Sequence, residues 1–164
     1  MRVLEILYGT IVDGPGLRTS IYFAGCKHHC PGCHNPSSWD FTGGHEMSVD
    51  EIFAKIKTNG FNVTCSGGDP LYQNIDELIS LAKKIKGIGL DLWLYTGFTI
   101  EEVLDLKIYD ELLKYVDVIV DGRFEIKNMD KSLLFRGSSN QRILKLLHDE
   151  DGNKIYYEIL KIEN

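Results

Sequence analysis

The fold is decided by a junction between a strand and a glycine-rich loop, Phe61-Asn62-Val63-Thr64-Cys65-Ser66-Gly67-Gly68-Asp69-Pro70. The alternation of apolar and polar side chains over residues 61–65 predicts a buried strand. Gly-Gly-Asp-Pro then ends the regular structure, and taken alone it is an ordinary turn. We expect Cys65 to act as a small buried hydrophobic residue, with a role as a metal ligand as the alternative.

The segments on either side repeat this order of strand, loop and helix. Ser48 and Glu51 form a capping box that opens a helix, Gly60 ends it, and Thr99 with Glu102 repeats the pattern later. The predicted strands cover residues 19–24, 61–65, 90–96 and 116–120, and the predicted helices cover residues 48–60, 74–86 and 99–115. Such alternation predicts parallel strands joined by right-handed crossovers.

We therefore predict an α/β fold with a mostly parallel sheet, arranged as an open, partial (β/α) barrel. About four or five strands are too few to close an eight-stranded barrel. Residues 142–147 and 154–160 are two apolar-periodic runs around a polar turn at 149–153, which predicts a small C-terminal hairpin. The whole chain, residues 1–164, is expected to be one domain.

Charge and hydropathy exclude several classes of protein. The chain has 18 Lys and Arg against 24 Asp and Glu, a formal net charge of −6, and no basic block. We therefore expect no nucleic-acid partner. No apolar run approaches the ~18 residues of a membrane span, and Glu5 falls where a signal peptide would have its apolar core. These features predict a cytoplasmic protein with no membrane partner.

Three of the four cysteines lie close together, as Cys26-x-x-x-Cys30-x-x-Cys33. In a reducing compartment such a group indicates a metal or redox site rather than disulfides. One hypothesis is a zinc site, in which His28, His29, His34 or His45 would supply the fourth ligand. The other is an iron–sulfur cluster, where three thiolates leave one iron open to a substrate or cofactor.

Glycine-rich or ligand-bearing segments follow four of the predicted strands. They are the cysteine loop, Gly67-Gly68-Asp69, Thr96-Gly97 and Asp121-Gly122. The carboxyl ends of parallel strands share one edge of a sheet, and binding sites form there. The sequence therefore predicts that these four segments meet.

Taken together, these motifs resemble those of the radical S-adenosylmethionine enzymes, and more narrowly the activating proteins of glycyl radical enzymes. The motif Asp13-Gly14-Pro15-Gly16-Leu17-Arg18-Thr19 is typical of those activases. Four further segments, at residues 30–33, 93–97, 120–124 and 136–142, are similar to the branch that activates anaerobic ribonucleoside-triphosphate reductase. The resemblance covers roughly residues 8–147. Two residues depart from the pattern of the wider superfamily, which often has an aromatic residue in place of Gly32 and a glutamate in place of Asp69. Both departures are consistent with the reductase-activating branch.

The resemblance implies a 4Fe–4S cluster held by Cys26, Cys30 and Cys33, with S-adenosylmethionine chelating the open iron. Reductive cleavage of this cofactor would give a 5′-deoxyadenosyl radical, which would take hydrogen from a glycine of the large catalytic reductase subunit. A low-potential donor such as flavodoxin would supply the electron. No catalytic residue beyond cluster and cofactor is implied.

Five further residues are expected to bind the cofactor: Gly67, Gly68, Asp69, Thr96 and Asp121. The glycine backbones would approach its methionine part, and a glycine carbonyl or the Asp69 carboxylate would pair with its ammonium group. Thr96 and Asp121 would reach the ribose or the methionine end, with capping or turn roles as the alternative.

Several other side chains have two interpretations. Trp93 and Tyr95 are expected in the core, with stacking on the adenine of the cofactor as the alternative. His28 and His29 are expected in solvent, whereas His34 is a candidate for a hydrogen bond to the cluster. Arg18 and residues 136–142 are candidates for partner contact or for structural salt bridges.

Two other functions remain open. One is a radical S-adenosylmethionine enzyme that acts on a small molecule, which would not need the motif at residues 136–142. The other is a zinc-binding or electron-transfer module, which would have no use for Gly67-Gly68-Asp69.

Overall fold

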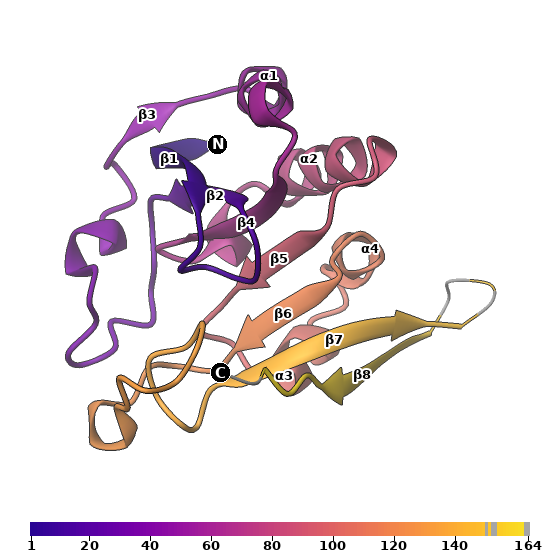
Figure 1. The fold of residues 1–164 in the computed structure, drawn as a ribbon. Helices are drawn as coiled ribbons and strands as arrows, with labels where there is room; N and C mark the ends of the chain where they lie inside the picture. The colour runs from indigo at the N-terminus through magenta and orange to yellow at the C-terminus, as the bar shows by residue number, and fades with distance from the viewer. Residues whose placement is uncertain (150, 152–153, 163–164) are drawn as a thin grey trace.

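A computed structural model describes residues 1–149, 151 and 154–162 of the chain, as an α/β protein built on one mixed sheet. The strand order is β3-β1-β2-β4-β5-β6-β7-β8, with β3 and β8 as the open edges (Figure 1). The strands are β1 (Arg2–Thr10), β2 (Arg18–Phe23), β3 (His45–Glu46), β4 (Asn62–Gly67), β5 (Leu92–Tyr95), β6 (Val118–Asp121), β7 (Arg142–His148) and β8 (Ile155–Ile159). The helices are α1 (Val49–Asn59), α2 (Ile75–Gly87), α3 (Ile100–Asp105) and α4 (Asp110–Leu113), with short 3-10 helices η1 (Pro36–Trp39), η2 (Pro70–Tyr72) and η3 (Ile126–Asn128).

The prediction of a mostly parallel sheet is wrong. Only the pairings β2–β4, β4–β5 and β5–β6 are parallel, and the other four are antiparallel. A parallel pairing needs a long crossover, and the helical crossovers of this chain lie between β2 and β6. The flanking strands return along their neighbours and pair antiparallel. The sheet is open, and the expected partial barrel is not confirmed.

The expected number of strands is also too low, because the sequence patterns do not reveal β1 and β3. β1 pairs with β2, but its register shifts between Val3 and Glu5 and again between Tyr8 and Thr10. These irregularities break the two-residue period on which strand prediction depends. β3 has only two residues, which pair with Arg2 and Val3.

Most local predictions within the α/β segment are confirmed, although the helical stretch expected over residues 99–115 is divided into α3 and α4. Both capping boxes are present, Ser48 with Glu51 at α1 and Thr99 with Glu102 at α3. Gly60 ends α1 in the left-handed conformation, with φ of 64°. The C-terminal hairpin also exists as β7 and β8, although residues 150, 152 and 153 of its predicted turn lie outside the described residues.

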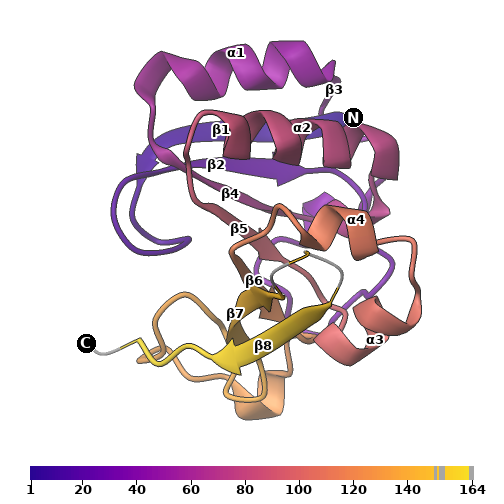
Figure 2. The same ribbon diagram turned by 90° about the vertical axis from the view of Figure 1, so that its right-hand side faces the viewer.

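Helices α1, α2 and α4 lie on one face of the sheet, toward the viewer in Figure 2. Alternate residues of the strands point to opposite faces, so Leu92 and Leu94 enter the helix-side core, together with the fully buried Cys65. Trp93 belongs to a second core on the other face. The predictions of a buried Cys65 and a core Trp93 are therefore confirmed.

That second core receives the end of the chain. Besides Trp93 it contains Val118, Val120 and Ile143, and Leu160 and Ile162 pack against it. The segment after β8 thus covers part of the helix-free face. No helix in the described ranges is both long enough and apolar enough to span a bilayer.

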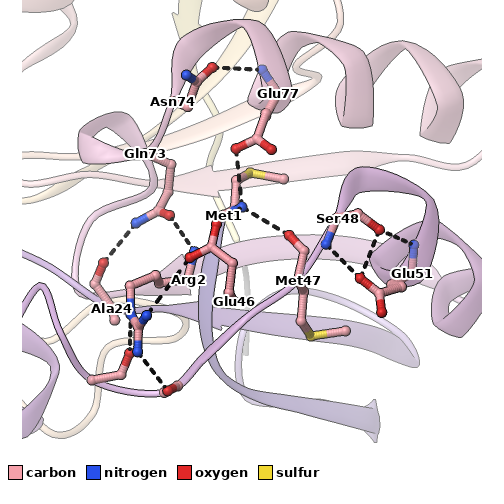
Figure 3. Close-up of polar contacts among 12 residues, drawn as sticks. Met1, Arg2, Ala24, Glu46, Met47, Ser48, Glu51, Gln73, Asn74 and Glu77 are labelled. Carbon is pink, nitrogen blue, oxygen red and sulfur yellow. Dashed lines mark hydrogen bonds and ion pairs between the residues drawn. The ribbon is translucent and has the colours of Figure 1, made fainter.

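Contacts at the amino-terminal end fix the chain just before the cysteine loop (Figure 3). The Gln73 side chain accepts a hydrogen bond from Arg2 N at 3.0 Å and donates to Ala24 O at 2.7 Å. The α-amino group of Met1 donates to Met47 O at 2.9 Å. Since Ala24 lies two residues before Cys26, Gln73 ties the start of the cysteine loop to β1.

Candidate functional site

Loops from the carboxyl ends of β2, β4 and β5 line a cavity of about 410 Å³. The loop after β2 contributes Cys26, Cys30 and Cys33, and the other two contribute Gly67-Gly68 and Thr96-Gly97. In Figure 1 these loops and those after β6 gather on the left, at the edge where the parallel strands end. The structure thus brings together the three cysteines and three of the five expected cofactor residues.

The cysteine loop is held by backbone contacts to the segment that follows it. Gly25 N donates to Ser38 O at 2.8 Å, and Cys26 N donates to Trp39 O at 3.3 Å. Gly25 has a φ of 102°, a conformation that favours glycine. All three cysteines of the loop are free thiols. The loop therefore presents three thiol groups to one cavity.

Burial changes the acidity of two of these thiols. Desolvation raises the pKa of Cys26 to about 11, against the opposing effect of the backbone N–H groups of His28 and His29. Desolvation raises the pKa of Cys30 as well. Both groups are protonated at neutral pH unless a cation stabilises the thiolate, as a bound metal does.

The donor set fits a 4Fe–4S cluster with one open iron. Three thiols line the cavity, while the fourth cysteine, Cys65, is 1% exposed in the helix-side core. Within the described ranges, no three His, Cys, Asp or Glu side chains form a group that could hold a single metal ion. A cluster does not need such convergence, because each thiolate binds a different iron.

The two glycines of the next loop leave no room for side chains. A Cβ at Gly68 would overlap the backbone oxygens of Gly25 and Ser38, and a Cβ at Gly67 would overlap the backbone of Phe23. Gly67 also has a φ of 103°. The backbone of this loop therefore packs directly against the cysteine loop at the cavity wall.

Asp69 is not among the residues that line the cavity, and it is 1% exposed. Its Oδ1 accepts from Leu71 N at 3.0 Å, which caps η2. Its Oδ2 accepts from Thr96 Oγ1 at 2.8 Å and from Gly97 N at 2.9 Å. The carboxylate therefore joins the loop after β4 to the loop after β5.

The prediction that His28 lies in solvent is wrong. Its side chain is 4% exposed, and its Nε2 lies 2.9 Å from Asp69 Oδ2. No local signal in the sequence indicates this pairing, since the two residues are 41 positions apart. His29 is exposed and lies against Trp39, with ring centroids 4.7 Å apart.

Asp121 does not line this cavity. Its carboxylate accepts from Ile100 N at 2.7 Å at the start of α3, and from Arg142 Nε at 3.0 Å. It lines a second cavity with Glu101 and Arg142. The geometry is that of a helix cap and a structural ion pair, the alternative considered for this residue.

Arg18 is structural as well. It is 1% exposed, donates to Thr64 Oγ1 at 2.7 Å and to Asp91 Oδ1 at 2.5 Å, and lies over the Trp93 ring at 5.2 Å. By contrast, Arg136 lines the main cavity while donating to Gln141 O at 2.8 Å.

The sequence reasoning gave no cavity role to Asp13, Phe124 and Phe135, which line the cavity wall. Tyr95, expected in the core, packs against the second core and also lines the cavity, and its hydroxyl donates to Phe135 O at 2.8 Å. Asp13 belongs to the Asp-Gly-Pro-Gly motif, which was a usable signal. The two phenylalanines lie in an irregular loop that carries no periodic pattern.

The chain matches the family model described as a 4Fe-4S single cluster domain over residues 12–144. It is 40% identical over 141 residues to the anaerobic ribonucleoside-triphosphate reductase-activating protein of Enterobacteria phage T4, covering 80% of this chain and 86% of the relative. The protein of the same name from Vibrio cholerae is 37% identical over 142 residues, covering 81% and 90%. That from Pasteurella multocida is 37% identical over 156 residues, covering 88% and 98%.

Proposed function

This chain belongs to the family of anaerobic ribonucleoside-triphosphate reductase-activating proteins, and on that premise we propose that it activates such a reductase by forming a glycyl radical on it. The single observation that carries the proposal is the shared cavity. Three free thiols and the backbones of Gly67 and Gly68 line it together.

We propose that Cys26, Cys30 and Cys33 hold a 4Fe–4S cluster and that S-adenosylmethionine occupies the open position. When bound, these groups would supply the chemistry: one-electron reductive cleavage of the sulfonium C–S bond to methionine and a 5′-deoxyadenosyl radical, which would take hydrogen from the reductase glycine. A low-potential donor such as flavodoxin supplies the electron. The family model for a single 4Fe-4S cluster supports the cluster part of this proposal.

The residues of the chain bind and orient these groups. Gly67 and Gly68 present backbone at the cavity wall, where carbonyl groups would accept hydrogen bonds from the ammonium group of the cofactor. Thr96 lines the cavity and supports its wall, since its hydroxyl donates to Asp69. Asp69 also supports the wall, because it links the loop after β4 to the loop after β5.

The aromatic residues of the cavity wall exclude water from the reacting groups. Tyr95 comes from the end of β5, and Phe124 and Phe135 come from the long segment between β6 and β7. Excluding water protects a reactive radical from side reactions. The protein thereby supplies binding, orientation and shielding, and the cofactors supply the chemistry.

The partner is the large catalytic subunit of the reductase, and we propose that the whole chain acts as one domain in the cytoplasm. The names of the relatives support the partner, because each is an activating protein of that reductase. The glycine would reach the cavity from outside the chain.

Electron paramagnetic resonance tests the proposal. Anaerobically reconstituted and reduced protein should give a cluster signal that changes when S-adenosylmethionine is added. Adding the reductase subunit should then give a glycyl radical signal. A cluster signal indifferent to the cofactor would contradict the proposal, and deoxyadenosine formed with a metabolite but without the reductase would favour a small-molecule enzyme.

A further inference from the structure

The ring of His28 joins the three loops of the cavity. His28 lies in the cysteine loop, between Cys26 and Cys30. Its Nε2 is 2.9 Å from Oδ2 of Asp69, in the loop after β4. The same oxygen accepts from Thr96 Oγ1 and Gly97 N, in the loop after β5. Oδ2 of Asp69, in the loop after β4, is thus contacted from both the cysteine loop and the loop after β5.

The chemistry of Asp69 fixes the direction of the contact. An ionised carboxylate has only acceptor atoms, so His28 Nε2 carries the hydrogen and donates. Asp69 is 1% exposed, and its other oxygen accepts from Leu71 N. A buried carboxylate needs such donors, and His28 is the donor that comes from the cysteine loop.

The surroundings hold the His28 ring in this position. Its centroid lies 4.6 Å from that of Phe98, edge to face, and 5.5 Å from that of Tyr72. A Cβ at Gly97 would overlap the ring. The ring is therefore packed against η2 and the loop after β5.

His28 lies two residues from both Cys26 and Cys30 in the chain. Because its ring is held against Asp69, the main chain between these two cysteines is held as well.

We propose that His28 is a positioning residue that locks the cysteine loop to the Gly67-Gly68 and Thr96-Gly97 loops through Asp69. The lock sets the distance between the cluster and the cofactor-binding backbone. The inference rests on the proposed function, since it assigns a role within that cluster and cofactor site.

Four substitutions in the full chain test the lock. His28→Leu removes the donor, while His28→Gln keeps an N–H at the ε position that reaches Asp69. His28→Asn also has an amide, but the shorter side chain does not reach Asp69. His29→Asn is the matched control, because His29 is exposed, lies in the same loop, and has a φ of 47° that asparagine tolerates.

The readout independent of activity is the cofactor concentration that half-converts the electron paramagnetic resonance signal of the cluster. With His28→Leu we expect unchanged iron per chain and a roughly tenfold higher half-converting concentration, as for a lost hydrogen bond to a charged group. His28→Gln should restore the value of the unsubstituted protein. His29→Asn should match the unsubstituted protein.

Equal cofactor titrations for His28→Leu and the unsubstituted protein would overturn the inference. So would the same loss in His29→Asn. If His28→Leu fails to hold iron, the comparison of His28→Gln with His28→Asn decides, and equal values for these two reject the lock. A cofactor-insensitive signal in the unsubstituted protein would instead reject the proposed function itself.

Discussion

The guanidinium of Arg142 pairs with the buried carboxylate of Asp121, with Nε 3.0 Å from Oδ1 and an Nη atom 2.5 Å from Oδ2. The pair joins β7 to the end of β6. Arg142 also donates to both oxygens of Glu101 in α3, at 3.0 and 2.7 Å. Tyr157 of β8 donates to Glu101 at 2.9 Å. One arginine therefore connects α3 and the C-terminal hairpin to the parallel part of the sheet.

Replacing Arg142 with methionine should destabilise the fold. Asp121 is 1% exposed, so loss of its partner leaves a buried carboxylate with only Ile100 N as a donor among the described residues. We expect the free energy of unfolding in urea to fall by about 2 to 3 kcal/mol.

Lys145→Met is the matched control on the same strand. Lys145 pairs with Glu158 at 3.8 Å, and both side chains are more than half exposed. Its loss should change the free energy of unfolding by less than about 0.5 kcal/mol. Equal effects of the two substitutions would contradict the structural role given to Arg142.

Acid should weaken the same connection. The Arg142 guanidinium holds the pKa of Glu101 at about 2, below its ordinary value of 4.5. The unfolded chain therefore binds a proton more readily than the folded one. The resulting stability is present above pH 4.5 and is lost as the pH falls toward 2.

Urea unfolding of the cluster-free chain between about pH 5.5 and 3 measures this dependence. Glu101→Gln has no carboxyl group at this position and should lose stability less steeply over that range. Parallel curves for the two proteins would show that Glu101 does not contribute to the acid sensitivity.

Single substitutions of Cys26, Cys30 or Cys33 by alanine should abolish cluster binding, because each removes one of three thiols at the cavity. Cys65→Ala should retain the cluster, since Cys65 is buried in the helix-side core. It should lower the free energy of unfolding by about 1 to 2 kcal/mol through lost packing. Iron per chain after reconstitution distinguishes the two results. Loss of iron in Cys65→Ala would show that Cys65 is a cluster ligand.

Gly68→Ala should disrupt the site without removing any polar group. The new Cβ would overlap the backbone oxygens of Gly25 and Ser38, neither of which can rotate away. We expect the cysteine loop to shift and the response of the cluster signal to S-adenosylmethionine to weaken at least roughly tenfold, as for about 1.4 kcal/mol of lost binding.

Gly87→Ala is its matched control. Gly87 is the last residue of α2, and a Cβ added there would meet no atom within 4 Å, so the methyl group enters open space. Alanine there should stabilise the chain by up to about 1 kcal/mol and leave the cofactor titration unchanged. A cofactor response that survives in Gly68→Ala would show that close packing of the two loops is not required.

Much of the local structure could be predicted, because it depends on residues near one another in the chain. The capping boxes at Ser48 and Thr99 join residues three positions apart, and the strand ends that bear glycines follow from alternation and turn chemistry. The cysteine spacing likewise predicted the three free thiols that share the cavity.

The sequence by itself determined the α/β order, the capped starts of α1 and α3 and the grouping of the three cysteines, since periodicity, caps and spacing act over a few residues. Tertiary structure decided the mixed direction of the sheet, the pairing of Asp121 with Arg142, and the burial of His28 against Asp69. These partners lie 21 and 41 positions apart, so no local pattern encodes them. They meet because the parallel strands end at one edge, where buried carboxylates must find donors from neighbouring segments.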